Sequence, residues 1–443
     1  MALLYNLFLV FFLAWGWPLL LVYMYHRQGS LEGLGERLGF GPRDESAAAS
    51  ARPVTWFHGA SVGEIRMLVP LIAAWQRNHP EEEILVTTMT MTGRQTAARV
   101  LPAARIRLLP FDLPGIWGRF FRRHRPARLV IAETELWPNL LGAAAKHGLP
   151  VALVNARISE KSFRGYRFFA FFTRSMFARL GLVVVQDEES GRRFTALGTP
   201  PERVVYCGNM KFDFEFDPLT GEGYAGLFPP ESLVLVAGST HPGEEEMLLA
   251  AWEEACRQVP GPAERACLVL APRHPQRFAE VAAWLREQNC GHQVFSELKK
   301  NSSRPRLAEL PRVLLLDTLG DLVFFYPLGR AAVIGGTLVP GIGGHNPLEA
   351  AVCGRAVIHG PHTASFRDGF RCLDEQGGGL PVADSAELTR LFVRIFREPE
   401  WITGKGGEAA ATMRRQRGAV ACTLEHLKSF FSPSRPPSGE DKV

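Results

Sequence analysis

The chain has 443 residues, of which 46% are hydrophobic and 21% charged, and this composition is ordinary for a globular protein. The length predicts about two or three domains. The formal net charge of +5 is too mild to indicate nucleic acid binding. Seven scattered cysteines without a C-x-x-C pair predict reduced thiols rather than a disulfide framework, and no metal-ligand spacing appears among the histidines and cysteines.

Residues 1–25 form an apolar segment without a charged side chain, long enough to span a bilayer. A cleaved signal peptide is the alternative, but the segment lacks a basic start and is too long for one. Arg27, Arg37 and Arg43 follow the segment, and no basic residue precedes it, so the positive-inside rule places the body of the chain in the cytoplasm. We predict an uncleaved single-pass anchor at 1–25 and a juxtamembrane linker at 26–52.

From residue 53 onward, short β-rich runs such as PVTWFHGA and EILVTTMT alternate with amphipathic stretches such as EIRMLVPLIAAWQRN. Strands of this length with helices between them indicate βαβ units and parallel sheets. We predict an α/β protein with two doubly wound, Rossmann-like domains at 53–215 and 232–428. A linker at 216–231 joins them, and 429–443 is a disordered tail. Since ligands bind at the carboxyl ends of such strands, a cleft between the domains is the expected site.

Charged residues follow several strand-like runs of the first domain. Glu64 lies where a helix is expected to start, so it either complements the helix dipole, at roughly 0.3–1 kcal/mol, or acts as a general base. Glu133 and Glu135 follow another run and point to opposite sides if the backbone is extended, and the sequence leaves open which of them faces the site. Lys211 either approaches a departing phosphate or is a solvated surface lysine.

Two segments of the first domain are rich in basic residues. Residues 99–128 hold eight arginines and a single acid, Asp112, and residues 156–180 mix arginine and lysine with six phenylalanines and a tyrosine. Such stretches suit a bilayer surface or an anionic lipid, and a core helix with an ordinary charged face is an equal alternative. Nucleic acid is disfavoured because no recognised nucleic-acid-binding motif is present.

Four loops at strand ends of the second domain carry residues suited to a nucleotide, since backbone amides, hydroxyls and arginine bind phosphate. In GTLVPGIGGHNPLEA, residues 336–350, the alternative is a helix cap with Asn346 as N-cap, Pro347 as the first helical residue and Glu349 completing a capping box. Singly each residue fits such a structural role, but together they predict a binding site. Its residues are Ser239, Thr240, His241, Pro272, Arg273, His274, Gly320, Asp321, Leu322, Gly343, Gly344, His345, Asn346, Pro347, Leu348 and Glu349.

The motifs FHGASVGE, AETELWPN, NARISEKSFRGY, GNMKFD, GSTHPGEE, APRHPQRF and GGHNPLEA occur together and in order. In this they resemble the 3-deoxy-D-manno-octulosonic acid (Kdo) transferases of lipopolysaccharide synthesis, over roughly residues 1–425. The resemblance implies a GT-B glycosyltransferase in which the two domains face a cleft. It also implies an inverting enzyme that needs neither metal nor cofactor. The implied donor is CMP-Kdo, and the implied acceptor is the lipid A precursor (lipid IVA) at the cytoplasmic face of the inner membrane.

Carried over residue by residue, Glu64 resembles the base that deprotonates the acceptor hydroxyl. Glu133 and Lys211 match positions that support the transition state. The second-domain loops match the CMP-binding segments, and the resemblance suggests that Glu349 holds the ribose hydroxyls. The chain departs from the family pattern at Gly-Asp-Leu, where Gly-Glu-Leu is expected, which puts a side-chain contact from Asp321 in doubt. The alternatives are a UDP-sugar-dependent glycosyltransferase or epimerase, and a non-catalytic membrane-anchored nucleotide-binding protein.

Overall fold

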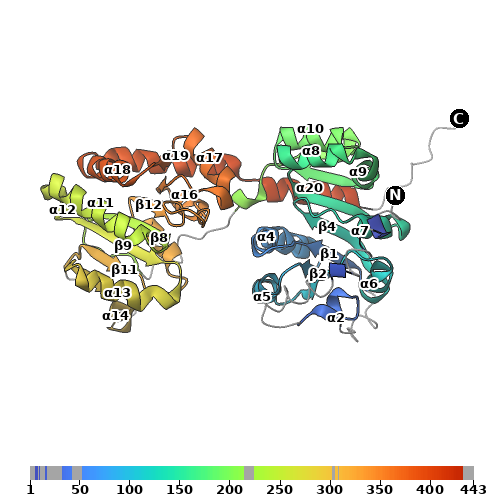
Figure 1. Cartoon of the computed structure of the whole chain (residues 1–443), viewed down its shortest axis with the longest axis horizontal. Coiled ribbons are helices and arrows are strands. Elements are labelled where there is room, and N and C mark those ends of the chain that lie inside the picture. The colour runs from blue at the N-terminus through green and yellow to red at the C-terminus, as the bar shows by residue number, and fades with distance from the viewer. Residues whose placement is uncertain are drawn as a thin grey trace. The chain divides into compact units, whose positions relative to one another are not determined.

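The computed structural model describes residues 5–7, 9, 15–16, 32–41, 52–213, 224–301, 305–307 and 309–432. The chain divides into two compact units, the first made of Met1–Asp213 and Arg417–Val443 and the second of Phe214–Gln416 (Figure 1). Most of the predicted anchor at 1–25 lies outside the described residues. Within them, no helix has the length and apolar character needed to cross a membrane.

The first unit is built on a seven-stranded, all-parallel sheet with the strand order β3-β2-β1-β4-β5-β6-β7. Its strands are β1 (Val54–His58), β2 (Glu83–Thr88), β3 (Arg105–Leu108), β4 (Pro126–Ala132), β5 (Val151–Ala156), β6 (Leu182–Val185) and β7 (Val204–Tyr206). Successive strand side chains alternate between two apolar clusters, with Trp56 in one and Phe57 in the other. The strands are therefore covered on both faces, as a parallel sheet requires.

Helices cover both faces of this sheet. Apolar residues of α6, α7, α9 and α10 pack in one cluster, and those of α4, α5 and α20 in the other. The helices are α2 (Leu34–Arg37), α4 (Val62–Asn78), α5 (Met91–Val100), α6 (Ile116–His124), α7 (Pro138–Lys146), α8 (Glu160–Phe168), α9 (Ala170–Phe177), α10 (Glu188–Ala196) and α20 (Ala419–Phe431), with 3-10 turns η1 (Pro201–Arg203) and η2 (Met210–Phe212).

The second unit repeats this plan with a seven-stranded parallel sheet in the order β10-β11-β9-β8-β12-β13-β14. Its strands are β8 (Leu233–Thr240), β9 (Ala266–Pro272), β10 (His292–Val294), β11 (Val313–Leu315), β12 (Ala331–Ile334), β13 (Ala356–His359) and β14 (Gly379–Pro381). The prediction of an α/β protein with two parallel sheets is therefore confirmed.

The helices of the second unit include α11 and α18, whose Trp252, Phe392 and Phe396 pack ring against ring beside the sheet. The helices are α11 (Glu244–Gln258), α12 (Pro260–Ala263), α13 (Phe278–Glu287), α14 (Phe295–Asn301), α15 (Leu322–Phe325), α16 (Leu348–Val352), α17 (Arg367–Glu375), α18 (Ser385–Arg397) and α19 (Pro399–Gln416), with 3-10 turns η4 (Pro275–Arg277), η5 (Tyr326–Leu328) and η6 (Ala364–Phe366).

The structure corrects the predicted bounds at the end of the chain and one prediction about the cysteines. The second domain is predicted at 232–428 and a disordered tail at 429–443, but α20 runs to Phe431 and packs in the first unit through Ala419, Leu424 and Leu427. A disulfide joins Cys207 to Cys422, so the prediction of reduced thiols is wrong for these two cysteines. The other five cysteines are free, in agreement with the prediction.

Candidate functional site

Two of the three candidate catalytic residues of the first unit, Glu64 and Glu133, lie at the carboxyl ends of β1 and β4. These neighbouring strands occupy the point where the strand order reverses direction. The loops that leave such a pair diverge and leave room for a ligand. Glu64 follows β1 by six residues, and Glu133 comes directly after β4. The fold therefore brings together two carboxylates that are far apart in the sequence.

The Glu64 carboxylate is held at the start of α4. Ser61 caps the helix, with its Oγ accepting from the Glu64 N–H at 3.3 Å. In return, Glu64 Oε1 accepts from Ser61 Oγ at 2.9 Å and Oε2 accepts from the Ala60 N–H at 2.7 Å. Burial raises the pKa of Glu64, these hydrogen bonds oppose the rise, and the nearby charges of Glu133 and Glu135 add to it. The carboxylate is thus both fixed in position and made more basic.

Glu133 is positioned by an uncommon backbone conformation and by an ion pair. Its φ of 54° is in the left-handed region, which non-glycine residues seldom adopt and which clusters at functional sites. Its Oε1 lies 2.6 Å from Lys211 Nζ. The neighbouring Glu135 takes no part in that pair, and burial followed by the charge of Glu133 raises its pKa. Glu133, rather than Glu135, is therefore the acid that joins Lys211.

Asn155 holds Lys211 in reach of Glu133. Asn155 is fully buried at the end of β5 with a φ of 53°, and its Oδ1 accepts from the Met210 N–H at 2.8 Å. Asn209 Oδ1 accepts from the Lys211 N–H at 3.0 Å, which caps the 3-10 turn η2. Asn155 was not among the predicted site residues, although it begins the quoted motif NARISEKS.

In the second unit, the equivalent position is the carboxyl end of β8 beside β12. Ser239 has a φ of 61°, and Gly335 approaches it so closely that a Cβ on Gly335 would lie 2.1 Å from the Ser239 carbonyl oxygen. Only glycine fits there. The side chain of Thr240 donates to Glu245 Oε1 at 2.8 Å, and Arg277 pairs with the same oxygen at 2.7 Å. The strand end is therefore shaped by buried contacts before any ligand arrives.

Glu244 organises the loops on both strands. It is fully buried in the first turn of α11, and its carboxylate accepts from the N–H groups of His241 at 2.9 Å, Gly336 at 2.8 Å and Leu338 at 3.0 Å. Burial raises the pKa of Glu244 and the three N–H groups oppose the rise. Sequence reasoning missed this residue, although the quoted motif GSTHPGEE contains it.

A cluster of nitrogen-bearing side chains lies at the same strand ends. The Nε2 atoms of His241 and His345 are 2.8 Å apart and their rings are stacked, and the His274 ring meets His241 edge-on at 5.3 Å. Burial, and then the charges of His241, Arg273 and His274, lower the pKa of His345 to about 4. The lowered pKa leaves the His345 imidazole neutral near pH 7, so Arg273 supplies the positive charge of the cluster and the rings offer N–H groups. Together they suit a bound anion such as a phosphate.

The turn around Asp321 is tied to other parts of the second unit. Asp321 accepts a hydrogen bond from the Tyr224 hydroxyl at 2.7 Å, and Lys299 Nζ lies 2.9 Å from its Oδ2. Burial raises the pKa of Asp321, but hydrogen bonds from Thr318, Lys299 and Tyr224 outweigh burial and bring the pKa below its usual value. The Asp321 side chain is therefore occupied within the protein. Gly320, with a φ of 86°, and Leu322, the first residue of α15, complete this turn.

The predicted capping box at residues 346–349 is not formed. Helix α16 begins at Leu348, with Pro347 rather than Asn346 at the N-cap and without a capping side chain. Asn346 Oδ1 accepts from the Leu348 N–H at 3.0 Å. Asn346 Nδ2 also donates to Glu349 Oε1 at 3.2 Å. The φ of 82° at Gly344 lets the preceding loop turn back, so that the Gly344 N–H bonds the Gly336 carbonyl oxygen at 2.8 Å. Pro272, the last residue of β9, and Gly343 lie in the same set of strand-end loops.

Comparison with known proteins identifies the family. Residues 32–214 match the family model of 3-deoxy-D-manno-octulosonic-acid transferase (kdotransferase). A 3-deoxy-D-manno-octulosonic acid transferase of Haemophilus influenzae is 32% identical, over 90% of this chain and 91% of that protein. The chain belongs to the Kdo transferase family. The protein is therefore a glycosyltransferase.

Further relatives extend this result over the whole described fold. A Kdo transferase of Bordetella pertussis is 33% identical, over 94% of this chain and 96% of that protein. Among solved structures, UDP-GlcNAc 2-epimerase of Neisseria meningitidis covers 85% of this chain and 99% of its own with a TM-score of 0.55 and 13% identity. That likeness concerns the fold, and it agrees with a GT-B arrangement of two α/β units.

The predicted site residues of this Kdo transferase take no part in the potential metal-ligand clusters of the described residues. One such cluster contains His79, Glu81 and Glu82, and the other contains Cys207, Cys422 and His426. The two cysteines of the second cluster are joined by the disulfide and so present no thiolates. Neither cluster includes Glu64, Glu133 or any residue of the second-unit loops.

Proposed function

We propose that the protein transfers Kdo from CMP-Kdo to the lipid A precursor lipid IVA, with inversion and without a metal ion, at the cytoplasmic face of the inner membrane in lipopolysaccharide biosynthesis. The observation that carries the proposal is the Glu64 carboxylate, fixed by two hydrogen bonds and with a raised pKa. A base of this kind suits removal of a hydroxyl proton, because general bases work best with a pKa near the working pH.

The residues of the two units take complementary roles in this proposal. The anion-attracting cluster of Arg273, His241 and His345 binds the phosphate of the donor, and the backbone amides of the strand-end loops add to that binding. Glu64 takes the acceptor proton, and the acceptor oxygen forms a bond to the anomeric carbon. The bond from that carbon to the phosphate oxygen breaks at the same time, and CMP leaves. A single displacement of this kind inverts the configuration.

Lys211 and Glu133 support the transition state. As the donor bond breaks, negative charge grows on the leaving phosphate and positive charge grows on the sugar. A preorganised ammonium group and a carboxylate stabilise these charges without reorganising, which is the largest contribution in many enzymes. Their contact at 2.6 Å holds both groups ready. The transmembrane anchor at 1–25 and the membrane location are parts of the proposal that rest on the apolar sequence of that segment.

The deciding experiment is Glu64→Gln in a transfer assay with enzymatically generated CMP-Kdo, lipid IVA and EDTA. Glutamine retains an acceptor oxygen and is favoured at this capping position, so the start of α4 is preserved. We expect transfer to fall by about 10²- to 10⁴-fold, while CMP still protects the protein against thermal unfolding. Glu189→Gln, on exposed surface of the same unit, is the matched control. Near-normal transfer by Glu64→Gln would contradict the proposed base, and protection by UDP instead of CMP would contradict the proposed donor.

A further inference from the structure

Helices α8 and α9 carry an apolar surface on the outside of the first unit. Phe168, Phe169, Phe171 and Phe172 have exposed fractions of 83%, 54%, 74% and 40%. The rings meet edge-to-face in two adjacent pairs, Phe168 with Phe169 at 4.9 Å and Phe171 with Phe172 at 5.4 Å. Single exposed apolar residues are ordinary, but large rings gathered at one place mark an interaction site. We call these four residues the phenylalanine surface.

The core of the unit has no need of these four rings. Helix α8 packs against the apolar cluster of the sheet through Phe163 and Tyr166. Met176 and Phe177 are the buried residues of α9, and the Tyr166 and Phe177 rings meet at 5.2 Å. The chain between α8 and α9 turns at Phe169. The four residues of the phenylalanine surface therefore do not belong to the apolar core.

Positive charge surrounds the phenylalanine surface. Residues 157–179 contain six basic residues and one acid, Glu160. Lys161, Arg167 and Arg174 are exposed and have no acidic partner within the described part of the chain. Exposed rings beside unpaired cations are the pattern of an interfacial membrane contact, where rings enter the headgroup region and cations pair with anionic lipid.

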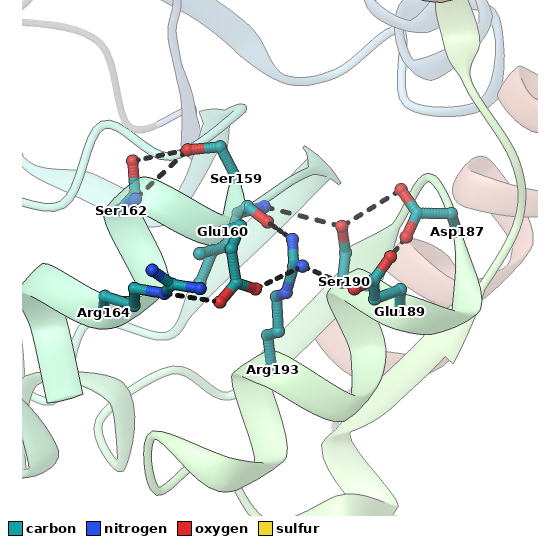
Figure 2. Close-up of polar contacts among 9 residues, drawn as sticks. Ser159, Glu160, Ser162, Arg164, Asp187, Glu189, Ser190 and Arg193 are labelled. Carbon is teal, nitrogen blue, oxygen red and sulfur yellow. Dashed lines mark hydrogen bonds and ion pairs between the residues drawn. The ribbon is translucent and has the colours of Figure 1, made fainter.

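Hydrogen bonds and ion pairs join the start of α8 to α10, as Figure 2 shows. Glu160 lies between Arg164 and Arg193, at 2.8 Å from each. Arg193 also donates to the Ile158 carbonyl oxygen at 2.6 Å, and Ser159 caps α8 by accepting from the Ser162 N–H. A surface held in place beforehand loses less conformational entropy on binding. This network therefore helps to orient helix α8, which leads to the phenylalanine surface.

We propose that the phenylalanine surface, with Lys161, Arg167 and Arg174, docks the first unit on an anionic lipid bilayer. The rings enter the boundary between headgroups and acyl chains, and the three cations pair with lipid phosphates. This inference deepens the proposed function, on which it rests for a membrane-resident acceptor. It adds a contact separate from residues 1–25 that keeps the unit bearing Glu64 against the bilayer.

The test uses the full-length protein in vesicles of phosphatidylethanolamine and phosphatidylglycerol. Phe171 is replaced by the photoreactive p-benzoyl-phenylalanine, and Leu319, 69% exposed in the second unit, is replaced in the same way as the control. After irradiation, mass spectrometry should find phosphatidylglycerol adducts at position 171 well above those at position 319. We expect Arg167→Gln and Arg174→Gln each to lower the adduct yield by about fivefold. No excess of lipid adducts at 171, or adducts to a second protein copy or to residues 1–25 instead, would overturn the proposal.

A second measurement separates this inference from the proposed function. The double variant Phe168→Ser, Phe171→Ser should transfer Kdo more slowly to lipid IVA in vesicles, while its rate on detergent-dispersed lipid IVA stays at the wild-type value. Leu319→Ser should change neither rate. If the wild-type protein transfers no Kdo in either format, the proposed function fails, and the adducts at position 171 still decide the docking surface. Equal slowing of the double variant in both formats would contradict a role in membrane docking.

Discussion

At the scale of single residues, the ion pair between Lys211 and Glu133 offers a direct test of function against stability. The side chains are 41% and 30% exposed, so solvent screens the pair and its contribution to stability is at most about 1 kcal/mol. We expect Lys211→Met to leave the denaturant midpoint nearly unchanged and to lower the transfer rate by about 10²-fold or more. The loss should appear in kcat at saturating CMP-Kdo.

The matched control for that prediction is Lys428→Met, which removes another lysine paired with a glutamate in the same unit, at 2.9 Å from Glu425. This control should change neither rate nor midpoint. If Lys211→Met behaves like Lys428→Met, the Lys211–Glu133 pair is an ordinary surface contact.

The burial of His58 makes the stability of the first unit depend on pH. The residue is fully buried at the end of β1, and its Nδ1 lies 3.1 Å from the Thr87 carbonyl oxygen and 2.9 Å from Thr87 Oγ1. Burial lowers the pKa of His58 to about 4, against a small opposing effect of the Thr87 carbonyl. Because the folded pKa lies below the unfolded value of about 6.5, the stabilisation is complete above pH 6.5 and is lost as the pH falls through 4.

The expected loss for His58 is about 3 kcal/mol at most. Thermal midpoints of the wild type and of His58→Gln, measured from pH 4 to 7.5, isolate this contribution, since glutamine can bond Thr87 but does not titrate. The wild type should lose stability more steeply below pH 6.5. Parallel pH profiles for the two proteins would show that His58 is not the titrating group.

The sequence identified the residues whose chemistry is visible in their type, such as Glu64, Glu133 and Lys211. It did not identify Asn155 and Glu244, whose importance lies in what they hold. Asn155 is a buried residue with a left-handed backbone, and the Glu244 carboxylate accepts from three backbone N–H groups. Both arrangements arise only through tertiary packing. Nothing in local spacing distinguishes Glu244 from its neighbours Glu245 and Glu246.

At the scale of elements, Glu244 joins helix α11 to the loops after β8 and β12. Glu244→Gln places an NH2 group where backbone N–H groups point, and an unsatisfied buried donor costs about 1–3 kcal/mol. We expect the loops to lose their arrangement and the Kd for CMP to rise by about tenfold or more. Titration calorimetry with CMP measures the change, and Glu253→Gln, exposed on the same helix, is the control. Unchanged CMP affinity in Glu244→Gln would show that these loops do not form the nucleotide site.

Most strands found from sequence are central ones, because strands buried on both faces appear as continuous apolar runs. The edge strand β7 is an exception, since the run RVVYCGN predicts it. The strands β3, β10 and β14 were missed. Their sequences RIRL, HQV and GLP are short, and each lies at an edge of its sheet with a single neighbour. RIRL and HQV carry polar residues, and GLP carries a glycine and a proline, which are uncommon inside strands, so no continuous apolar run marks these three. The same reasoning explains why β3 was interpreted only as part of a basic segment.

At the scale of the whole molecule, the chain does not follow a simple order of first domain and then second. Helix α20 lies beyond the second unit in sequence but packs in the first. Its amphipathic pattern fits any sheet face, so sequence alone assigns it to the nearer domain. Asp213, at the end of the first unit's main segment, accepts from the N–H groups of Gly418 at 2.6 Å and Val420 at 2.5 Å, which fixes where the chain returns.

The disulfide between Cys207 and Cys422 closes this long connection, since its two residues are 215 positions apart in sequence. A crosslink over a loop of this size restricts the unfolded chain, an effect of about 5 kcal/mol in the chain-entropy model. We therefore expect Cys422→Ser, or dithiothreitol, to lower the free energy of unfolding of the first unit by up to that amount. Denaturant titration followed by tryptophan fluorescence measures the change, and Cys353→Ser, a free thiol in the second unit, is the control.

Loss of the disulfide should weaken the first unit without releasing α20. Leu424 and Leu427 remain packed against the apolar cluster, and the two hydrogen bonds to Asp213 do not involve sulfur. Limited trypsin digestion at low denaturant should therefore leave residues 419–431 protected in Cys422→Ser. The variant Leu427→Ser with the disulfide intact should expose them, because it removes a fully buried leucine. The opposite result, cleavage in Cys422→Ser and protection in Leu427→Ser, would mean that the covalent bond, and not packing, holds the helix in the first unit.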